Sequence, residues 1–198
     1  FSSNEAGTIS YGGSCSSGTT SASSGTNSIS FNTLSDGTYS DCTITVTDPA
    51  GNASSPLSVN TFEVDLIGPT VSSTFPADNR SGVIIQSGSS NCNDCLSSTG
   101  INISVTFNES VDSTSVTTKV GESNTSCSGT FQVSSTNFQS CVGMRIQPSA
   151  SNSNRTFTVT TVYKLINETT YKIRLTTGIK DSLGNPIQNQ YTTSNGFT

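Results

Sequence analysis

A D-x-x-G-N pattern occurs twice in this chain, as Asp48, Gly51 and Asn52 and again as Asp181, Gly184 and Asn185. Carboxylate and amide oxygens are hard ligands that suit calcium. The same residue types also build turns, because Asp and Asn accept hydrogen bonds from nearby backbone N–H groups and Gly tolerates positive φ. A D-x-D-x-D-G calcium loop is absent from the sequence. The repetition therefore favours a shared hairpin turn, with calcium as the alternative.

Other carboxylates could also do chemistry. Glu109 and Asp112 could form the acid pair of a glycoside hydrolase, and Asp65 could help to hold an ion between two domains. Glu109 and Asp112 directly follow an expected strand, where a solvated, hydrogen-bonded loop is the simpler interpretation. The chain contains no His, which excludes Ser-His-Asp hydrolysis and His-ligated metal sites. We predict a non-enzymatic protein without a cofactor or a bound metal.

The cysteines are even in number and lie at Cys15, Cys42, Cys92, Cys95, Cys127 and Cys141. Without His, zinc would need an all-Cys site, and Cys92 and Cys95 form the single CxxC spacing. This spacing falls in a Ser/Gly/Asn-rich loop, which favours a structural bond over a redox motif. An even count in an acidic chain predicts disulfides and an oxidising compartment.

Their pairing follows from their distribution along the chain. Cys15 and Cys42 are the only cysteines in the first third of the chain, so we expect them to pair. Among the other four, three connectivities are open. We prefer a bond between Cys127 and Cys141, closing an excursion, and a local bond between Cys92 and Cys95.

The composition indicates an all-β fold. Only 30% of residues are hydrophobic and 11% charged, while 39 Ser and 31 Thr make up 70 of 198 positions. The apolar residues fall in short alternating runs rich in Val, Ile, Thr, Phe and Tyr, the pattern of half-buried strands. The longest aliphatic run is residues 83–85, far short of the roughly 20 residues of a membrane helix. We therefore predict no membrane span.

Charge is divided unevenly along the chain. Residues 1–67 contain six acids and no Lys or Arg, whereas residues 68–198 contain seven acids and eight bases, giving the net charge of −5. A segment without Lys or Arg cannot supply the phosphate contacts that dominate nucleic-acid affinity. We expect no nucleic-acid partner.

The sequence predicts two domains, residues 1–67 and 68–198. Gly68 and Pro69 indicate a short linker, because these residues punctuate strands. Alternation places Cys42, Ile44 and Val46 on one face of a strand, packed against Ile9, Tyr11, Ile29, Phe31 and Val59. The strands expected in the first domain are Gly7–Tyr11, Ser28–Phe31, Thr38–Thr47 and Leu57–Asp65. In the second domain we expect strands at 101–107, 156–162 and 171–175.

Two segments carry a family resemblance. Leu34–Tyr39, which is similar to a tyrosine corner, the strand after it and the turn at 47–52 resemble bacterial Ig-like repeats of large surface proteins. Residues 69–198 resemble the SbsA-type Ig-like domain of S-layer proteins, through the matching segments 68–71, 75–78, 105–112, 171–173 and 179–186. The resemblance implies two tandem Ig-like β-sandwiches on a bacterial cell surface, acting as spacers or adhesive modules without catalytic residues.

Three functions follow from this interpretation. The first is a disulfide-stiffened spacer or stalk in a surface protein, in contact with neighbouring Ig-like domains. The second is a subunit that assembles with copies of itself into a filament or S-layer by strand addition, with residues 1–7 as the exchanged segment. The third is an adhesin module that binds a carbohydrate or a host protein. The seven Asn-x-Ser/Thr sequons occur at the frequency that chance gives and leave glycosylation open.

Overall fold

The computed structural model describes residues 1–83, 100–122 and 126–198. The described residues form strands and no helix, which confirms the all-β class. The chain divides into two compact units, Phe1–Leu66 and Ile67–Thr198, and each is described by itself. Within the described ranges, no helix is long and apolar enough to cross a membrane.

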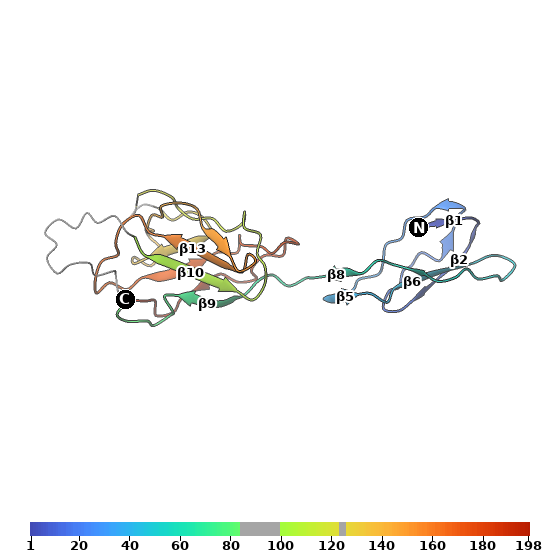
Figure 1. Ribbon diagram of the computed structural model, residues 1–198, viewed down its shortest axis with the longest axis horizontal. Helices are drawn as coiled ribbons and strands as arrows, with labels where there is room; N and C mark the ends of the chain where they lie inside the picture. The colour runs from blue at the N-terminus through green and yellow to red at the C-terminus, as the bar shows by residue number, and fades with distance from the viewer. Residues whose placement is uncertain (84–99, 123–125) are drawn as a thin grey trace. The chain divides into compact units, whose positions relative to one another are not determined.

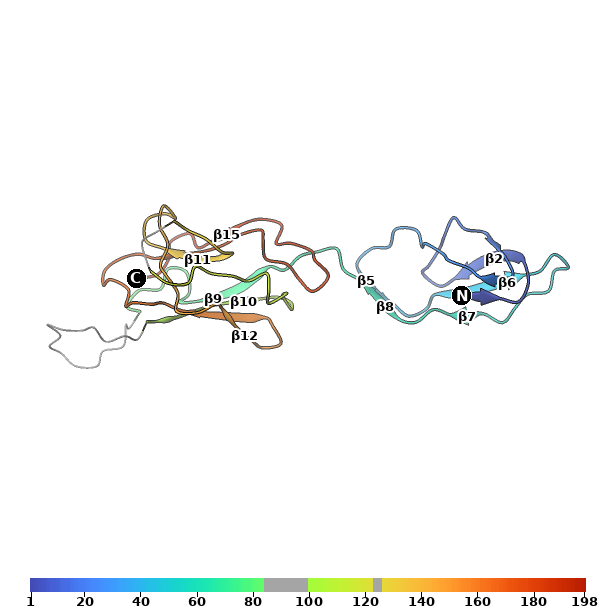
Figure 2. The same ribbon diagram turned by 90° about the horizontal axis from the view of Figure 1, so that it is seen from above.

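The second unit is a sandwich of two antiparallel sheets. One sheet has the order β12-β13-β10-β9 and the other the order β11-β14-β15, and the two layers are seen edge-on in Figure 2. The first sheet comprises β9 (Val71–Phe75), β10 (Asn102–Phe107), β12 (Ser149–Ser151) and β13 (Thr156–Thr160). The second comprises β11 (Phe131–Ser134), β14 (Lys172–Leu175) and β15 (Tyr191–Thr192).

Strict alternation builds the core between these sheets. Ile103, Val105 and Phe107 point inward from β10 and are at most 2% exposed. Inward residues of β11, β13 and β14 complete the cluster, among them Phe131, Val133, Phe157, Val159, Ile173 and Leu175. Every second residue of a strand faces the same side, so the period-2 pattern of the sequence becomes a single apolar layer.

The first unit is smaller and its strands are short. Its main sheet has the order β3-β2-β6-β7, and two further pairs are β5-β8 and β1-β4; Figure 1 shows this unit with β2 and β6 at its centre. The bounds of these strands are β1 (Ser2–Ser3), β2 (Gly7–Gly12), β3 (Ser21–Ala22), β4 (Gly25–Thr26), β5 (Gly37–Tyr39), β6 (Thr43–Thr47), β7 (Leu57–Ser58) and β8 (Phe62–Val64).

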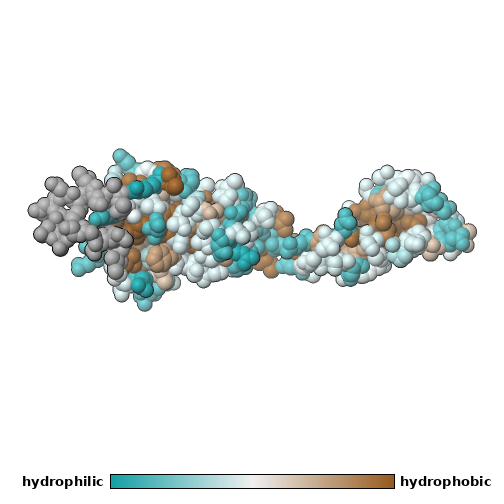
Figure 3. Space-filling view, viewed as in Figure 1, coloured by the Kyte–Doolittle hydropathy of each residue, from teal (hydrophilic) through white to brown (hydrophobic). Residues whose placement is uncertain are grey.

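The core of the first unit is small. Only Ile9, Ala22 and Ile44 form its buried cluster. The partly buried residues packed against them include Tyr11, Ile29, Val46 and Val59, which confirms most of the predicted face. A groove beside this cluster is lined by Phe1, Ile29, Phe31, Ile44, Leu57 and Val59, and Figure 3 shows apolar surface gathered on this unit.

Three predicted strands of the first unit are wrong. Residues 28–31 form no strand: the flanking Asn27 binds the backbone of Ser23 and Gly25 through its side chain instead. The expected strand Thr38–Thr47 is two strands, because the chain leaves the β5–β8 pair after Tyr39 and joins the main sheet at Thr43. The expected strand Leu57–Asp65 is likewise divided, into β7 and β8, each pairing with a different partner.

Candidate functional site

The last residues of the second unit are tied to the segment that follows its first strand. Asn79 donates its backbone N–H to the carbonyl of Gly196 (2.6 Å), and Thr198 donates to the carbonyl of Arg80 (2.9 Å). Val83 in turn donates to the carbonyl of Thr198 (3.0 Å). We call the contact between residues 78–83 and 194–198 the terminal clamp.

Asp78 is the centre of the terminal clamp. Its carboxylate accepts backbone hydrogen bonds from Ser194 (3.0 Å), Asn195 (3.0 Å) and Gly196 (2.6 Å). Partial desolvation raises the pKa of this carboxyl, but the donations from Gly196, Ser194 and Asn195 outweigh it and hold the pKa below its ordinary value. The carboxylate form of Asp78 therefore fastens three successive residues of the terminal segment.

The geometry of the clamp needs glycine at position 196. Gly196 has a φ of 78°, and a Cβ at this position would lie 2.3 Å from the carbonyl oxygen of Tyr171. The neighbouring Phe197 forms a pair of backbone hydrogen bonds with Tyr171 (2.8 and 2.9 Å). Gly196 thus lets the chain pass between Asp78 on one side and Tyr171 on the other.

The two segments of the clamp run in the same direction, since residues 79 and 80 pair with residues 196 and 198, respectively. A pulling force applied at the two ends of the unit would draw the first segment toward β9 and the second segment toward Thr198. These two pulls act along the segments in opposite directions, so the hydrogen bonds are loaded together in shear rather than opened one at a time.

A second set of contacts fixes the start of the unit. Thr70 donates its N–H to the side-chain oxygen of Asn108 (2.7 Å), and Asn108 returns its own N–H to the carbonyl of Thr70 (3.0 Å). Gly68 lies close to the residue that follows the second D-x-x-G-N turn. A Cβ added at Gly68 would be 1.9 Å from the carbonyl oxygen of Pro186. The first residues of the unit therefore pack on the second D-x-x-G-N turn.

That turn is held by its own aspartate. Asp181 is 3% exposed and accepts hydrogen bonds from the N–H of Leu183 (2.8 Å), the N–H of Asn185 (2.9 Å) and the Asn185 side chain (2.8 Å). Burial raises the pKa of Asp181, and the donations from Asn185 and Leu183 lower it further than burial raises it. Gly184 has a φ of 94°, the conformation for which the turn uses glycine.

The first D-x-x-G-N turn has the same construction. Asp48 accepts from the N–H of Asn52 (2.8 Å) and from its side-chain amide (2.8 Å), and Gly51 has a φ of 92°. The hydrogen bond from the Asn52 side chain is the main reason why the pKa of Asp48 lies below its ordinary value. In both turns the carboxylate oxygens accept hydrogen bonds from groups of the turn itself. The hairpin interpretation of the D-x-x-G-N pattern predicts such bonds.

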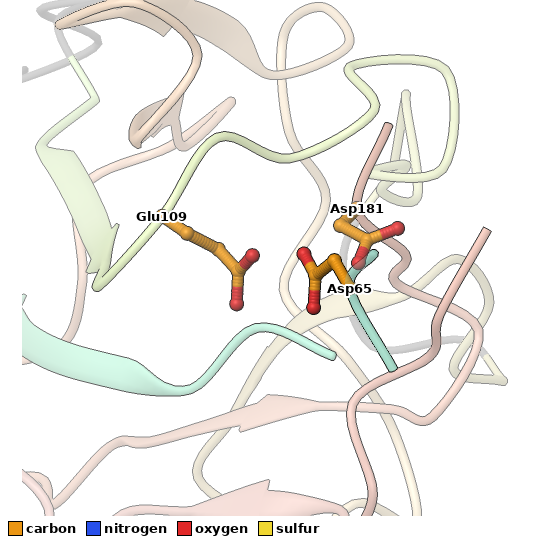
Figure 4. A group of neighbouring side chains, drawn as sticks. All are labelled: Asp65, Glu109 and Asp181. Carbon is orange, nitrogen blue, oxygen red and sulfur yellow. The ribbon is translucent and has the colours of Figure 1, made fainter. Parts of the chain in front are cut away.

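Glu109 and Asp112, the two residues considered as a catalytic acid pair, have different neighbours. Asp112 binds the N–H (2.9 Å) and hydroxyl (2.8 Å) of Thr114, and these bonds, with Lys180 nearby, lower its pKa. Glu109 instead has a carboxylate oxygen within 4.8 Å of one on Asp181, and Figure 4 shows Glu109 extending toward the turn that carries Asp181. Asp65, the third side chain in Figure 4, belongs to the first unit.

Among the described residues of this unit, Glu109 and Asp181 form a close pair of carboxylates that could contact a cation. Calcium takes roughly six to eight oxygen ligands, and these two carboxylates would supply only part of that shell. The pair is therefore a close approach of two carboxylates, and it is not a complete calcium site. Calcium at the two turns, and an ion held with the help of Asp65, stay predictions.

Two disulfide bonds lie in the described residues, Cys15–Cys42 and Cys127–Cys141. The first ties the loop after β2 to the start of β6 beside the small core of the first unit. The second closes residues 127–141, and the expectation that this segment is an excursion is wrong in part, because it contains β11, whose Phe131 and Val133 lie in the core. Cys92 and Cys95 lie outside the described residues.

Sequence reasoning did not find the role of Asp78. The residue stood within a segment of the family resemblance, and nothing near it in sequence indicates that it binds residues 116–118 positions later. The local signal was that Asp78, a short polar residue, lies two positions after Pro76, and Pro76 is buried. Hydrogen bonds between distant backbone segments leave no periodic pattern in the sequence.

Two stacked antiparallel sheets, a core of alternating residues and stabilised turns define an Ig-like β-sandwich. Residues 65–198 match the family model for the bacterial Ig-like domain, and the chain belongs to that family. No curated protein and no solved structure matches the chain.

Proposed function

We propose that the chain is a load-bearing spacer of a bacterial cell-surface protein. The observation that carries this proposal is the terminal clamp, in which residues 78–83 and 194–198 run in the same direction and share the hydrogen bonds around Asp78. A module of a stalk transmits tension through its two chain ends, and this arrangement loads the bonds at those ends together. A catalytic role has no comparable support.

Covalent bonds support the same role. Cys15–Cys42 fixes a unit whose buried apolar cluster has three residues, and Cys127–Cys141 fixes the segment of the second unit that contains β11. Small secreted domains commonly compensate for a limited core in this way. The extracellular location, in an oxidising environment, is part of the proposal, as is the narrower assignment of residues 69–198 to the SbsA type.

The proposal is tested by pulling the full chain from its two ends in a single-molecule force experiment, between marker domains of known unfolding force. The expected record has a separate event for the second unit, at a force above that of an α-helical marker, which opens bond by bond. Unfolding of the second unit below the helical marker would overturn the load-bearing role.

The self-assembling subunit is the second candidate. Ser2–Ser3 pairs with Gly25–Thr26 of the same unit, and Phe1 exchanges hydrogen bonds with Asn27. Strand exchange would require these bonds to open in one copy and reform in another. Light scattering on the non-reduced chain separates the candidates: a monomer at micromolar concentration supports the spacer, and a polymer supports the subunit.

A further inference from the structure

The outer face of the β11-β14-β15 sheet carries a buried polar cluster that the spacer role does not use. Gln132 of β11 and Arg174 of β14 lie directly opposite each other. Gln132 is only 6% exposed although it faces away from the core, and on this face it binds Arg174, over which the loop after β11 places Phe138.

The guanidinium of Arg174 is held in a fixed position. Its Nε (2.7 Å) and Nη2 both donate to Oε1 of Gln132, and Gln132 is itself fixed by a bond from its Nε2 to the carbonyl of Gly129 (2.7 Å). The ring of Phe138 lies 4.0 Å from the central carbon of the guanidinium. Contacts between Arg and an aromatic face are favourable, more so when they are shielded from water.

The backbone that carries Phe138 is in an unfavourable conformation. Asn137 and Phe138 have φ values of 52° and 64°, a region that bulky residues rarely adopt. The hydroxyl of Ser134 accepts a hydrogen bond from the N–H of Phe138 (3.0 Å) and helps to hold it there. Strain of this kind persists where the surroundings impose it and gathers at binding sites.

Arg174 has no acidic partner among the residues that the structure describes. No carboxylate within those residues forms an ion pair with it, and burial alone lowers its pKa. A partly buried charge normally has a counter-charge. Gln132 uses the Nε side of the guanidinium, so two N–H groups on Nη1 and one on Nη2 have no acceptor in the described residues.

We propose that Arg174 is the recognition site for the carboxylate of an acidic sugar. The edge formed by Nη1 and Nη2 matches a carboxylate in two parallel hydrogen bonds. The neighbours of Arg174 on this face suit a sugar, because Thr192 lies opposite it on β15 and Gln190 contacts Thr192. Hydroxyl and amide groups of this kind pair with sugar hydroxyls.

The test uses the full, non-reduced chain and two probes that differ only in charge, methyl β-D-glucuronide and methyl β-D-glucoside. In an NMR titration we expect the glucuronide to shift the Arg174 Nε–Hε and Phe138 ring signals saturably, and the glucoside to leave them in place. Equal shifts from both probes, or no shift with either, would overturn the proposal.

Variants separate recognition from general charge attraction. Arg174→Lys keeps the charge and a donor for Gln132 but loses the paired N–H edge, and we expect its affinity to fall about tenfold. Lys172→Gln removes a charge from the same strand and face, and should leave the affinity within about twofold. Equal losses in both variants would overturn the site.

A last comparison distinguishes an acidic sugar from an acidic protein as the ligand. An acidic peptide of alternating Glu and Gly should bind Arg174 more weakly than the glucuronide at the same carboxylate concentration. Tighter binding of the peptide would overturn the sugar in favour of a protein partner. Phe138→Leu preserves the apolar cover of the excursion while removing the aromatic face, and should weaken glucuronide binding less than Arg174→Lys does.

Discussion

The carboxylate of Asp78 accepts a 2.6 Å hydrogen bond from the backbone N–H of Gly196, 118 positions further along the chain. This bond joins the segment after the first strand of the second unit to its last residues. It is charge-assisted, and such bonds are stronger than neutral ones. Part of what holds the terminal segment therefore depends on the ionised state of one side chain.

The first prediction concerns pH. The pKa values of Asp78 and Asp181 in the folded chain lie below their ordinary values. Their contribution to the free energy of unfolding is complete above the unfolded-state pKa of about 3.9 and is lost as pH falls through the folded-state pKa. Denaturant unfolding between pH 7 and pH 2 should show stability that is flat near neutrality and falls below about pH 4.

The control for that prediction is Asp78→Asn, measured over the same pH range. The variant should be less stable at pH 7 by about 1 kcal/mol, a figure reduced for the solvent exposure of the carboxylate. The difference from the native chain should shrink as the pH falls. A difference that stays constant down to pH 2 would show that ionisation of Asp78 is not what holds the clamp.

The second prediction concerns the buried turn aspartate. Asp181→Asn places a side-chain N–H₂ against that of Asn185 and removes one acceptor, so the second unit should lose about 1.5–3 kcal/mol of stability. Asp48→Asn makes the same change in the exposed turn of the first unit and serves as the matched control. A loss at Asp48 as large as that at Asp181 would contradict the importance of burial at the second turn.

The third prediction concerns Gly68. Gly68→Ala introduces a methyl group 1.9 Å from the carbonyl oxygen of Pro186, and the resulting shift of backbone should cost about 1–3 kcal/mol. Gly18→Ala is the control, because a Cβ at Gly18 meets no atom within 4 Å. Thermal unfolding followed by circular dichroism measures both. An unchanged melting temperature for Gly68→Ala would show that this segment does not pack on the turn.

The fourth prediction concerns the excursion closed by Cys127 and Cys141, whose sequence separation is 14. While the bond is intact these residues cannot extend under force. The double variant Cys127→Ala/Cys141→Ala should therefore lengthen the extension of the unfolded second unit by about 45 Å, at about 3.5 Å per residue and less the 4.9 Å that the bonded Cα atoms already span. It should also lose about 3 kcal/mol of stability. An unchanged extension would mean that the bond is not formed in the isolated protein.

The sequence predicted the features that depend on local pattern. Alternation at 101–107 identified a central strand, because every second side chain enters the same core. The D-x-x-G-N turns were predictable because their hydrogen bonds lie within five residues. Both features are determined by residues that lie close together in the sequence.

Features that depend on distant contacts were not predictable in the same way. Ile29 packs in the core, yet its segment pairs with no strand, since burial of an apolar residue does not require a ladder. Arg174 was expected to point outward. Its contact with Phe138 could not be predicted, because that contact depends on how the loop after β11 lies against β14. The partners of Asp78 could be identified only once the sheets had brought the end of the unit next to its start.

The most direct test of the account is the force at which the second unit of the full chain unfolds, compared between the native protein and Asp78→Asn. Asp112→Asn, which alters a carboxylate outside the clamp, is the control. The account predicts a lower unfolding force for Asp78→Asn and a nearly native force for Asp112→Asn. Equal unfolding forces for the native chain and Asp78→Asn, with the folded state intact in both, would contradict the claim that the terminal clamp bears the load.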